Sequence, residues 1–297
     1  MLSVLITSLC SNNFVNKELS ITTIDSTSHE YVYNLSHKNS ELIWEAENVR
    51  LLGLQFDYLI SKDSFFQFIY KQNISNDAQM DDYDWLKDYT SDWSHWSTHP
   101  NTVLDNYTIL DLSVHYRLQS KSSVEQNFIV GYKDIAKSFR AYDGTFIYST
   151  DNGFRDNPFT SKGLGISYEE SFKSLYMGFS LKKEFTHFSI SGIFKYSPLV
   201  VAINRDTHHK RYYVDTNEFD TTTMTDIGIK VEYPIKKNIS IVYKYQNLNY
   251  EETRGILTRS YYDGATEKTA GTVTAYSGAA GISNSYSSSG LALVVKF

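Results

Sequence analysis

The sequence of 297 residues is poor in cysteine, in proline and in long apolar runs. Its single cysteine, Cys10, excludes an internal disulfide framework and any cluster of metal-binding thiolates. No apolar run approaches the ~18 residues that a membrane-spanning helix needs. A membrane protein built from strands is still compatible with the sequence, because its apolar residues alternate along the chain and form no run.

Positive charge is also in short supply. The chain has 28 Lys and Arg against 34 Asp and Glu, a formal net charge of −6 at pH 7, and no dense basic block. This balance argues against a nucleic-acid partner.

A two-residue alternation of apolar and polar side chains is what the sequence does contain. Successive side chains of a strand point to opposite faces, so each alternating segment has one apolar and one polar face. The clearest segment is 109–118, and the pattern recurs at 52–60, 164–168, 175–181, 188–196, 227–233 and 239–245. A soluble β-sandwich could give the same alternation.

Three further features favour an outer-membrane barrel. The apolar faces end in Tyr and Phe, as girdles at two membrane interfaces do. The last residues, GLALVVKF, form an alternating strand that closes on Phe297. Short connections at 61–64, 119–124, near 186 and at 234–238 alternate with long polar stretches near 34–40, 71–106, 143–162, 204–218 and 250–280. We therefore predict an all-β fold: a ten-stranded antiparallel transmembrane β-barrel with long extracellular loops.

The N-terminal stretch MLSVLITSLCSNNF has a short apolar run like that of a secretory signal, without preceding basic residues. We predict that residues 1–17 are the remnant of a signal peptide. No linker or change of composition divides the rest, so residues 18–297 are predicted to form one outer-membrane barrel domain.

Two polar pairs fall in the long stretches on the same predicted rim. Asp82 and Asp84 are two residues apart, as are Asp206 and His208. If the strands extend beyond the membrane, this spacing points each pair together into the mouth of the barrel. Two carboxylates opposite an Asp–His pair can activate water. Taken singly, each pair is as readily explained as solvated loop residues.

With their neighbours, these residues resemble the omptins, outer-membrane endopeptidases of Gram-negative bacteria. The most specific motifs are Asp82–Trp85, Trp93–Pro100, Tyr148–Asp156 and Phe194–Ser197, followed by the Asp206 pair. The resemblance runs in order from about Ser20 to Phe297.

The resemblance implies a barrel that rises above the membrane with a proteolytic groove across its top. Asp206 and His208 would orient and deprotonate a water, while Asp82 and Asp84 would hold that water and the scissile carbonyl. The resemblance requires no covalent nucleophile. No metal is predicted either, because no HExxH-type spacing is present.

The resemblance also implies substrate-binding residues. Glu30 matches the acid at the base of the pocket for a basic side chain before the cut. At the position of the family's second acid in this pocket, this chain has Asn204. His95 replaces an acid that favours a basic residue after the cut. We expect cleavage near basic residues, with looser selectivity than two-acid pockets give.

Omptins also need lipopolysaccharide, which a Tyr-x-Glu-x-Arg strand motif and a further arginine hold on the outer wall. This chain has Tyr132 and Asp134, but Ala136 and Ser171 stand where the arginines belong. Lys137 and Lys173 lie one or two positions away. The sequence leaves a lipopolysaccharide requirement open and predicts no other cofactor.

The predicted function is that of an aspartic-type endopeptidase in the cell outer membrane, with its active site facing outward. Its predicted partners are protein or peptide substrates at the cell surface and outer-membrane lipid. The alternative is a barrel that serves as an adhesin or receptor and retains a relict groove. The presence of Asp82, Asp84, Asp206 and His208 together favours the enzyme.

Overall fold

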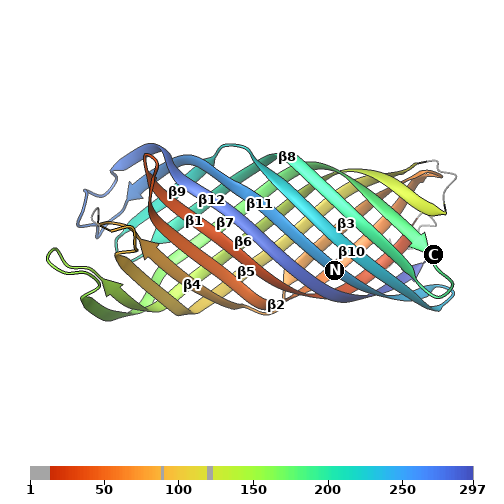
Figure 1. The fold of residues 1–297 in the computed structure, drawn as a ribbon, viewed down its shortest axis with the longest axis horizontal. Helices are drawn as coiled ribbons and strands as arrows, with labels where there is room; N and C mark the ends of the chain where they lie inside the picture. The colour runs from red at the N-terminus through yellow and green to blue at the C-terminus, as the bar shows by residue number, and fades with distance from the viewer. Residues whose placement is uncertain (1–13, 88–89, 119–122, 297) are drawn as a thin grey trace.

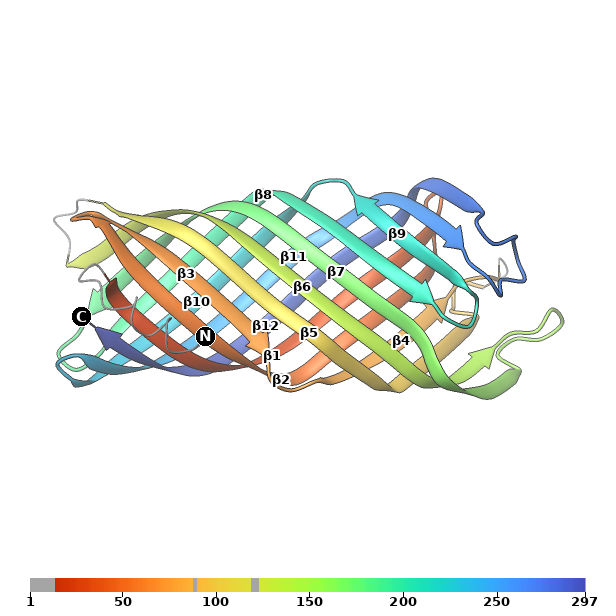
Figure 2. The same cartoon turned by 180° about the vertical axis from the view of Figure 1, so that it is seen from behind.

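The computed structural model describes residues 14–87, 90–118 and 123–296, which form a long closed cylinder of strands (Figures 1 and 2). No helix in these ranges is long and apolar enough to cross a membrane. The strands are β1 (Phe14–Asn34), β2 (His37–Ser61), β3 (Ser64–Asn73), β4 (Asp77–Asp84), β5 (His95–Arg117), β6 (Val124–Tyr148), β7 (Asn157–Glu184), β8 (Ser189–His208), β9 (Tyr213–Phe219), β10 (Thr222–Lys236), β11 (Ile239–Tyr261) and β12 (Val273–Lys296).

Strand β1 closes the ring, because it pairs with β12 on one side and with β2 on the other. Leu19 of β1, for example, stands opposite both Leu293 and Leu54. The paired strands are antiparallel, and closure removes the free edges that would otherwise leave backbone groups unpaired in a membrane. The prediction of an all-β antiparallel barrel is confirmed.

Two positions in the ring are each filled by two strands in succession. Strands β3 and β4 both pair with β2 and β5. Strands β9 and β10 both pair with β8 and β11. The twelve strands in the described part of the chain therefore occupy ten positions around the ring. The predicted number of ten matches the number of positions in the ring, but the number of separate strands is twelve.

The prediction of long loops at the outer rim is wrong for most of their length, because the chain there continues as strand. The stretch 71–106 contains β4, and 204–218 contains the end of β8 and most of β9. The connections 149–156 and 262–272 are the loops that project at the left in Figure 1. Residues 119–122 of the predicted turn 119–124 lie outside the described ranges.

The predicted domain start at residue 18 lies within strand β1, which begins at Phe14. Residues 1–13 of the predicted signal remnant lie outside the described ranges.

The outer wall carries an apolar band. On β7, Leu175, Met177, Phe179 and Leu181 are each more than half exposed, whereas Tyr176 between them is buried. Exposed apolar side chains recur in the same manner on β8, β10, β11 and β12. This alternation gives the barrel the lipid-facing surface that a strand-built membrane protein needs.

The interior beneath the outer rim is filled by aromatic side chains. Trp44 stacks on Tyr168 with ring centroids 5.0 Å apart, and Phe139 packs against Trp44 at 5.4 Å. All three are buried. This packed core supports the rim from below.

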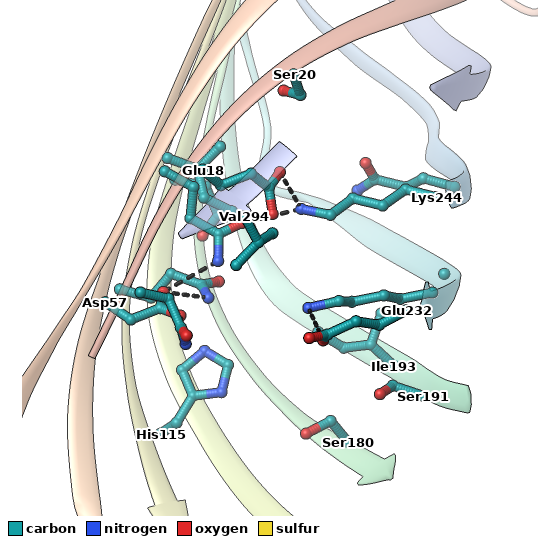
Figure 3. A pocket seen from close by; sticks show the side chains of 18 of the residues that line it. Glu18, Ser20, Asp57, His115, Ser180, Ser191, Ile193, Glu232, Lys244 and Val294 are labelled. Atoms are coloured by element: carbon teal, nitrogen blue, oxygen red, sulfur yellow. Dashed lines mark hydrogen bonds and ion pairs between the residues drawn. The ribbon is translucent and has the colours of Figure 1, made fainter. Parts of the chain in front are cut away.

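Charged side chains form the next layer of the interior. Asp111 lies 2.6 Å from Lys195 and 3.4 Å from Lys133, and all three are buried. Toward the other end of the barrel is a cavity of about 470 Å³, where Glu18 pairs with Lys244 (Figure 3). This cavity is remote from the outer rim, so it plays no part in the site that the sequence predicts there.

Candidate active site

Strand β8 ends at the rim with Asp206 and His208 two residues apart. The Nε2 atom of His208 lies 2.6 Å from Oδ2 of Asp206. His208 also stacks on Tyr213 of β9, with ring centroids 4.3 Å apart. The remaining oxygen of Asp206, Oδ1, is buried and has no hydrogen-bond partner within the described chain. The imidazole is therefore held on two sides, in the arrangement of a base and its orienting carboxylate.

Asp82 and Asp84 lie on β4, and not in a loop as the sequence suggested. Asp82 accepts a hydrogen bond from Ser40 Oγ at 3.1 Å. Burial, followed by repulsion from Asp84, raises the pKa of Asp82 well above its usual range. Burial likewise raises the pKa of Asp84. Such a pair favours holding one proton over losing both.

The two pairs act on each other across the mouth of the barrel. Strands β4 and β8 stand on different sides of the ring. Asp206 is nevertheless among the charges that raise the pKa of Asp82, and His208 is among those that lower the pKa of Asp84. The structure thus gathers the four residues singled out in the sequence into one polar group. Nowhere in the described ranges are three His, Cys, Asp or Glu side chains grouped so that they could hold a metal ion.

Glu30 of β1 lies near this group as a buried carboxyl. Asn204 and Asn217 each direct Nδ2 toward Glu30 Oε1, at 3.5 and 3.4 Å. The other oxygen, Oε2, is buried without a partner among the described atoms. Burial, followed by the charge of Asp206, raises the pKa of Glu30 well above its usual range. A cation that entered here would give the carboxyl its missing partner.

His95 is the first residue of β5 and stands opposite Asp84 in the β4–β5 register. Its Nδ1 atom lies 2.9 Å from Ser94 Oγ, and its ring meets Tyr148 edge-on at 4.7 Å. Burial lowers the pKa of His95, although Asp84 acts against this. His95 therefore lies beside the acid pair, where it adds no negative charge.

The sequence reasoning missed a second set of residues around the site. On β9, Tyr213, Asp215 and Asn217 are buried at alternate positions opposite the buried side of β8. Arg259 of β11 binds Asp215. Arg211, in the turn that joins β8 and β9, interacts with the Tyr213 hydroxyl. The alternation of Tyr213, Asp215 and Asn217 is the available signal, but it falls within the stretch 204–218, for which the polar composition predicts a loop.

The residues considered for lipid binding lie on different sides of the barrel wall. Lys173 stands opposite Asp134 in the β6–β7 register and is exposed, and Ala136 stands opposite Ser171. Lys137, by contrast, is buried inside the barrel. It is therefore not a cation of the outer wall.

Fold and site together define an outer-membrane β-barrel with a buried acid–histidine group at its rim. The family model of the Omptin family matches residues 11–297, nearly the whole chain. The chain belongs to the Omptin family.

Similar proteins carry consistent names. The plasminogen activator of Yersinia pestis is 26% identical over 237 residues, which cover 78% of this chain and 75% of that protein. Protease 7 of Escherichia coli O157:H7 is 29% identical over 203 residues, which cover 66% of this chain and 64% of that protein.

A solved structure shares the fold. The outer membrane protease OmpT from Escherichia coli superimposes with a TM-score of 0.89 at 22% identity, covering 96% of this chain and 97% of that one. The family and fold of the chain are thus those of an outer-membrane protease.

Proposed function

We propose that this chain is an outer-membrane endopeptidase that hydrolyses peptide bonds near basic residues with a water activated by Asp206 and His208. The observation that carries the proposal is the 2.6 Å contact between these side chains, with Asp82 and Asp84 acting on them across the barrel mouth. The names of the relatives, a plasminogen activator and outer-membrane proteases, support the broader part of the proposal.

His208 acts as the general base. Its Nε2 atom is directed to Asp206, so Nδ1 is the nitrogen that takes a proton from the attacking water. Asp206 fixes the orientation of the ring and stabilises the imidazolium that forms. The water oxygen adds to the scissile carbonyl carbon. His208 then returns the proton to the leaving amine as the C–N bond breaks.

The acid pair serves the other side of the reaction. Because burial raises the pKa of both Asp82 and Asp84, one carboxyl of the pair carries a proton and donates a hydrogen bond to the developing oxyanion. The ionised carboxyl of the pair accepts a hydrogen bond from the water. Two neighbouring carboxyls thereby take different roles.

The residue before the cut is proposed to enter the pocket of Glu30. A Lys or Arg side chain there would partner the buried carboxyl and lower its pKa, so that binding releases a proton. Asn204 contributes a hydrogen bond but no charge, which makes the preference for a cation weaker than two acids would. Beyond the cut, His95 gives a basic side chain no anionic partner.

The dependence on lipid is proposed to be weaker than in relatives with arginines on the outer wall. Lys173, beside Asp134, is a cation in this region for an anionic lipid headgroup. Ala136 and Ser171 add none. Lipopolysaccharide would then increase activity without being strictly required.

A quenched fluorescent peptide with a central Arg-Arg pair tests the proposal on refolded barrel. The parent should cleave it, and His208→Ala or Asp206→Ala should lower kcat by about 10²- to 10⁴-fold, the range for loss of a general base. Both variants should keep the heat-modifiable gel mobility of a folded barrel. A fully active His208→Ala variant would refute the mechanism. A folded parent that cleaves nothing, with or without lipopolysaccharide, would favour the adhesin or receptor alternative.

A further inference from the structure

A ladder of cross-strand neighbours stands beside the Asp206–His208 pair. In the registers of β8, β9 and β11, Asp206 is opposite Asp215, and Asp215 is opposite Arg259. Two residues further along β8, on the same face of the sheet and nearer the rim, His208 is opposite Tyr213. Directly opposed side chains on one face of a sheet lie about 5 Å apart at Cβ, so each rung is a contact.

Arg259 joins the two rungs. Its Nε and Nη2 atoms donate to the two carboxylate oxygens of Asp215 at 2.8 and 2.7 Å, a fork of parallel hydrogen bonds. Its guanidinium carbon lies 3.9 Å from the centre of the Tyr213 ring. A forked arginine is well suited to hold a carboxylate and an aromatic face at once, because its donors lie in one rigid plane.

Tyr213 transmits this constraint to the imidazole. The tyrosine is 2% exposed, so its ring has little room to move. It stacks on His208 at 4.3 Å and also contacts Tyr261 at 5.9 Å. The orientation of the His208 ring therefore depends on a side chain that Arg259 holds in place.

The guanidinium also balances a charge. Asp215 is buried beside Asp206, and burial raises the pKa of Asp215 while Arg259 acts against the rise. Without Arg259, the buried Asp215 carboxyl would lose its cationic partner next to the base.

We propose that Arg259 is a positioning residue of the active site. Through Asp215 and Tyr213, it holds the His208 ring in line with Asp206 and neutralises the carboxylate that stands opposite Asp206 on β9. It acts through these two side chains and does not contact the substrate. The inference rests on the proposed function, since the orientation of His208 affects turnover only if His208 is the base.

The test compares kcat and KM of refolded full-length variants on the Arg-Arg peptide, with rates referred to the folded fraction in the gel-mobility assay. Arg259→Gln should lower kcat by about 10- to 100-fold, the cost of a small misalignment, with KM within about twofold. Arg259→Lys should recover part of kcat, because it restores the charge without the fork. The double variant of Arg259→Gln with Asp215→Asn should lose less than the product of the two single losses, because it removes both charges.

Arg254 supplies a matched control. It lies on the same strand, its guanidinium is 3.6 Å from the Tyr33 ring, and it donates a hydrogen bond to the backbone oxygen of Leu35. Arg254→Gln should retain the kcat of the parent. The inference is overturned if Arg259→Gln keeps the parental kcat, or if its loss appears only in KM, while His208→Ala is inactive. An active His208→Ala would instead overturn the proposed function itself.

Discussion

Ser40 of β2 donates a hydrogen bond to Asp82 of β4 at 3.1 Å, although Ser40 stands opposite Asp84 in the strand register. The Ser40 hydroxyl therefore lies beside both carboxyls. It lowers the pKa of each carboxyl, against the burial that raises both.

Ser40→Ala should move the bell-shaped pH profile of kcat/KM to higher pH. Loss of the hydrogen bond raises the pKa of both carboxyls, so the pair loses its protons at higher pH. A hydrogen bond worth ~1 kcal/mol corresponds to a shift of roughly half to one pH unit. The control is Ser64→Ala at the opposite end of the barrel, which should leave the profile in place. A Ser40→Ala profile that coincides with that of the parent would contradict this role.

Glu30→Gln should stabilise the barrel, and more so at pH 8 than at pH 5. The pKa of Glu30 is raised in the folded state, so its contribution to stability is complete below the unfolded value and is lost as pH rises through the folded value. Glutamine cannot ionise and avoids that loss. The difference in stability between the variant and the parent is measured by the midpoint of the heat-modifiable transition, which shifts by about 2–4 °C for each kcal/mol.

Glu41 gives the opposite sign in the same measurement. The hydrogen bond from His29, followed by that from Lys38, lowers the pKa of Glu41. Its stabilisation is therefore present above the unfolded pKa and is lost on acidification, so Glu41→Gln should weaken the barrel at pH 8. For Glu30→Gln, a stability difference from the parent that is equal at pH 5 and pH 8 would refute the raised pKa of Glu30.

Restoring acids to the substrate groove should narrow selectivity toward Arg-Arg. Asn204→Asp adds charge beside Glu30, and His95→Asp adds an anionic partner after the cut. In the parent, protonation of His95 repels a basic residue, but burial lowers its pKa, so this repulsion should appear only below the ~6.5 of an ordinary histidine. A peptide library profiled at pH 5 and 7.5 measures both effects. Selectivity that does not change in the two variants would refute this description of the groove.

Lys173→Ala should reduce the increase in activity that lipopolysaccharide produces, while the activity without lipid remains unchanged. Lys173 is exposed on the outer wall opposite Asp134, and we propose it as a contact for an anionic headgroup. Lys183→Ala, near the other end of the same strand, is the control. Titration of the activity with lipopolysaccharide gives the comparison, and an equal response in both variants would exclude Lys173 as a lipid contact.

The membrane-spanning part of the fold could be predicted because its two faces differ in polarity. On β7 the exposed Leu175 and Met177 flank the buried Tyr176, so period two is visible in the sequence. The spacing of the two residue pairs could also be read from the sequence, since i and i+2 on one strand share a face. The resemblance of the surrounding motifs to the omptins was needed to distinguish these pairs from solvated loop residues.

The rim strands lack that contrast, which is why β4 and β9 were taken for loops. Polar residues occupy both faces of Asp77–Asp84 and of Tyr213–Phe219, so neither strand has one face that is entirely apolar. The position of Arg259 was beyond reach for another reason. Its contact with Asp215 depends on the register of β9 against β11, which is set by the closure of the whole barrel and not by local sequence.

The charged layer in the interior bears on where the products of the proposed cleavage would go. A peptide fragment that crossed this layer toward the inner side would part Asp111 from Lys195 and Lys133, which would leave the buried Asp111 carboxylate without its counterions. If the proposed site cleaves its substrate at the rim, the products therefore leave on one side. Both fragments would return to the medium from which the substrate came, and the cell would gain the destruction or activation of an external protein but no import of its pieces.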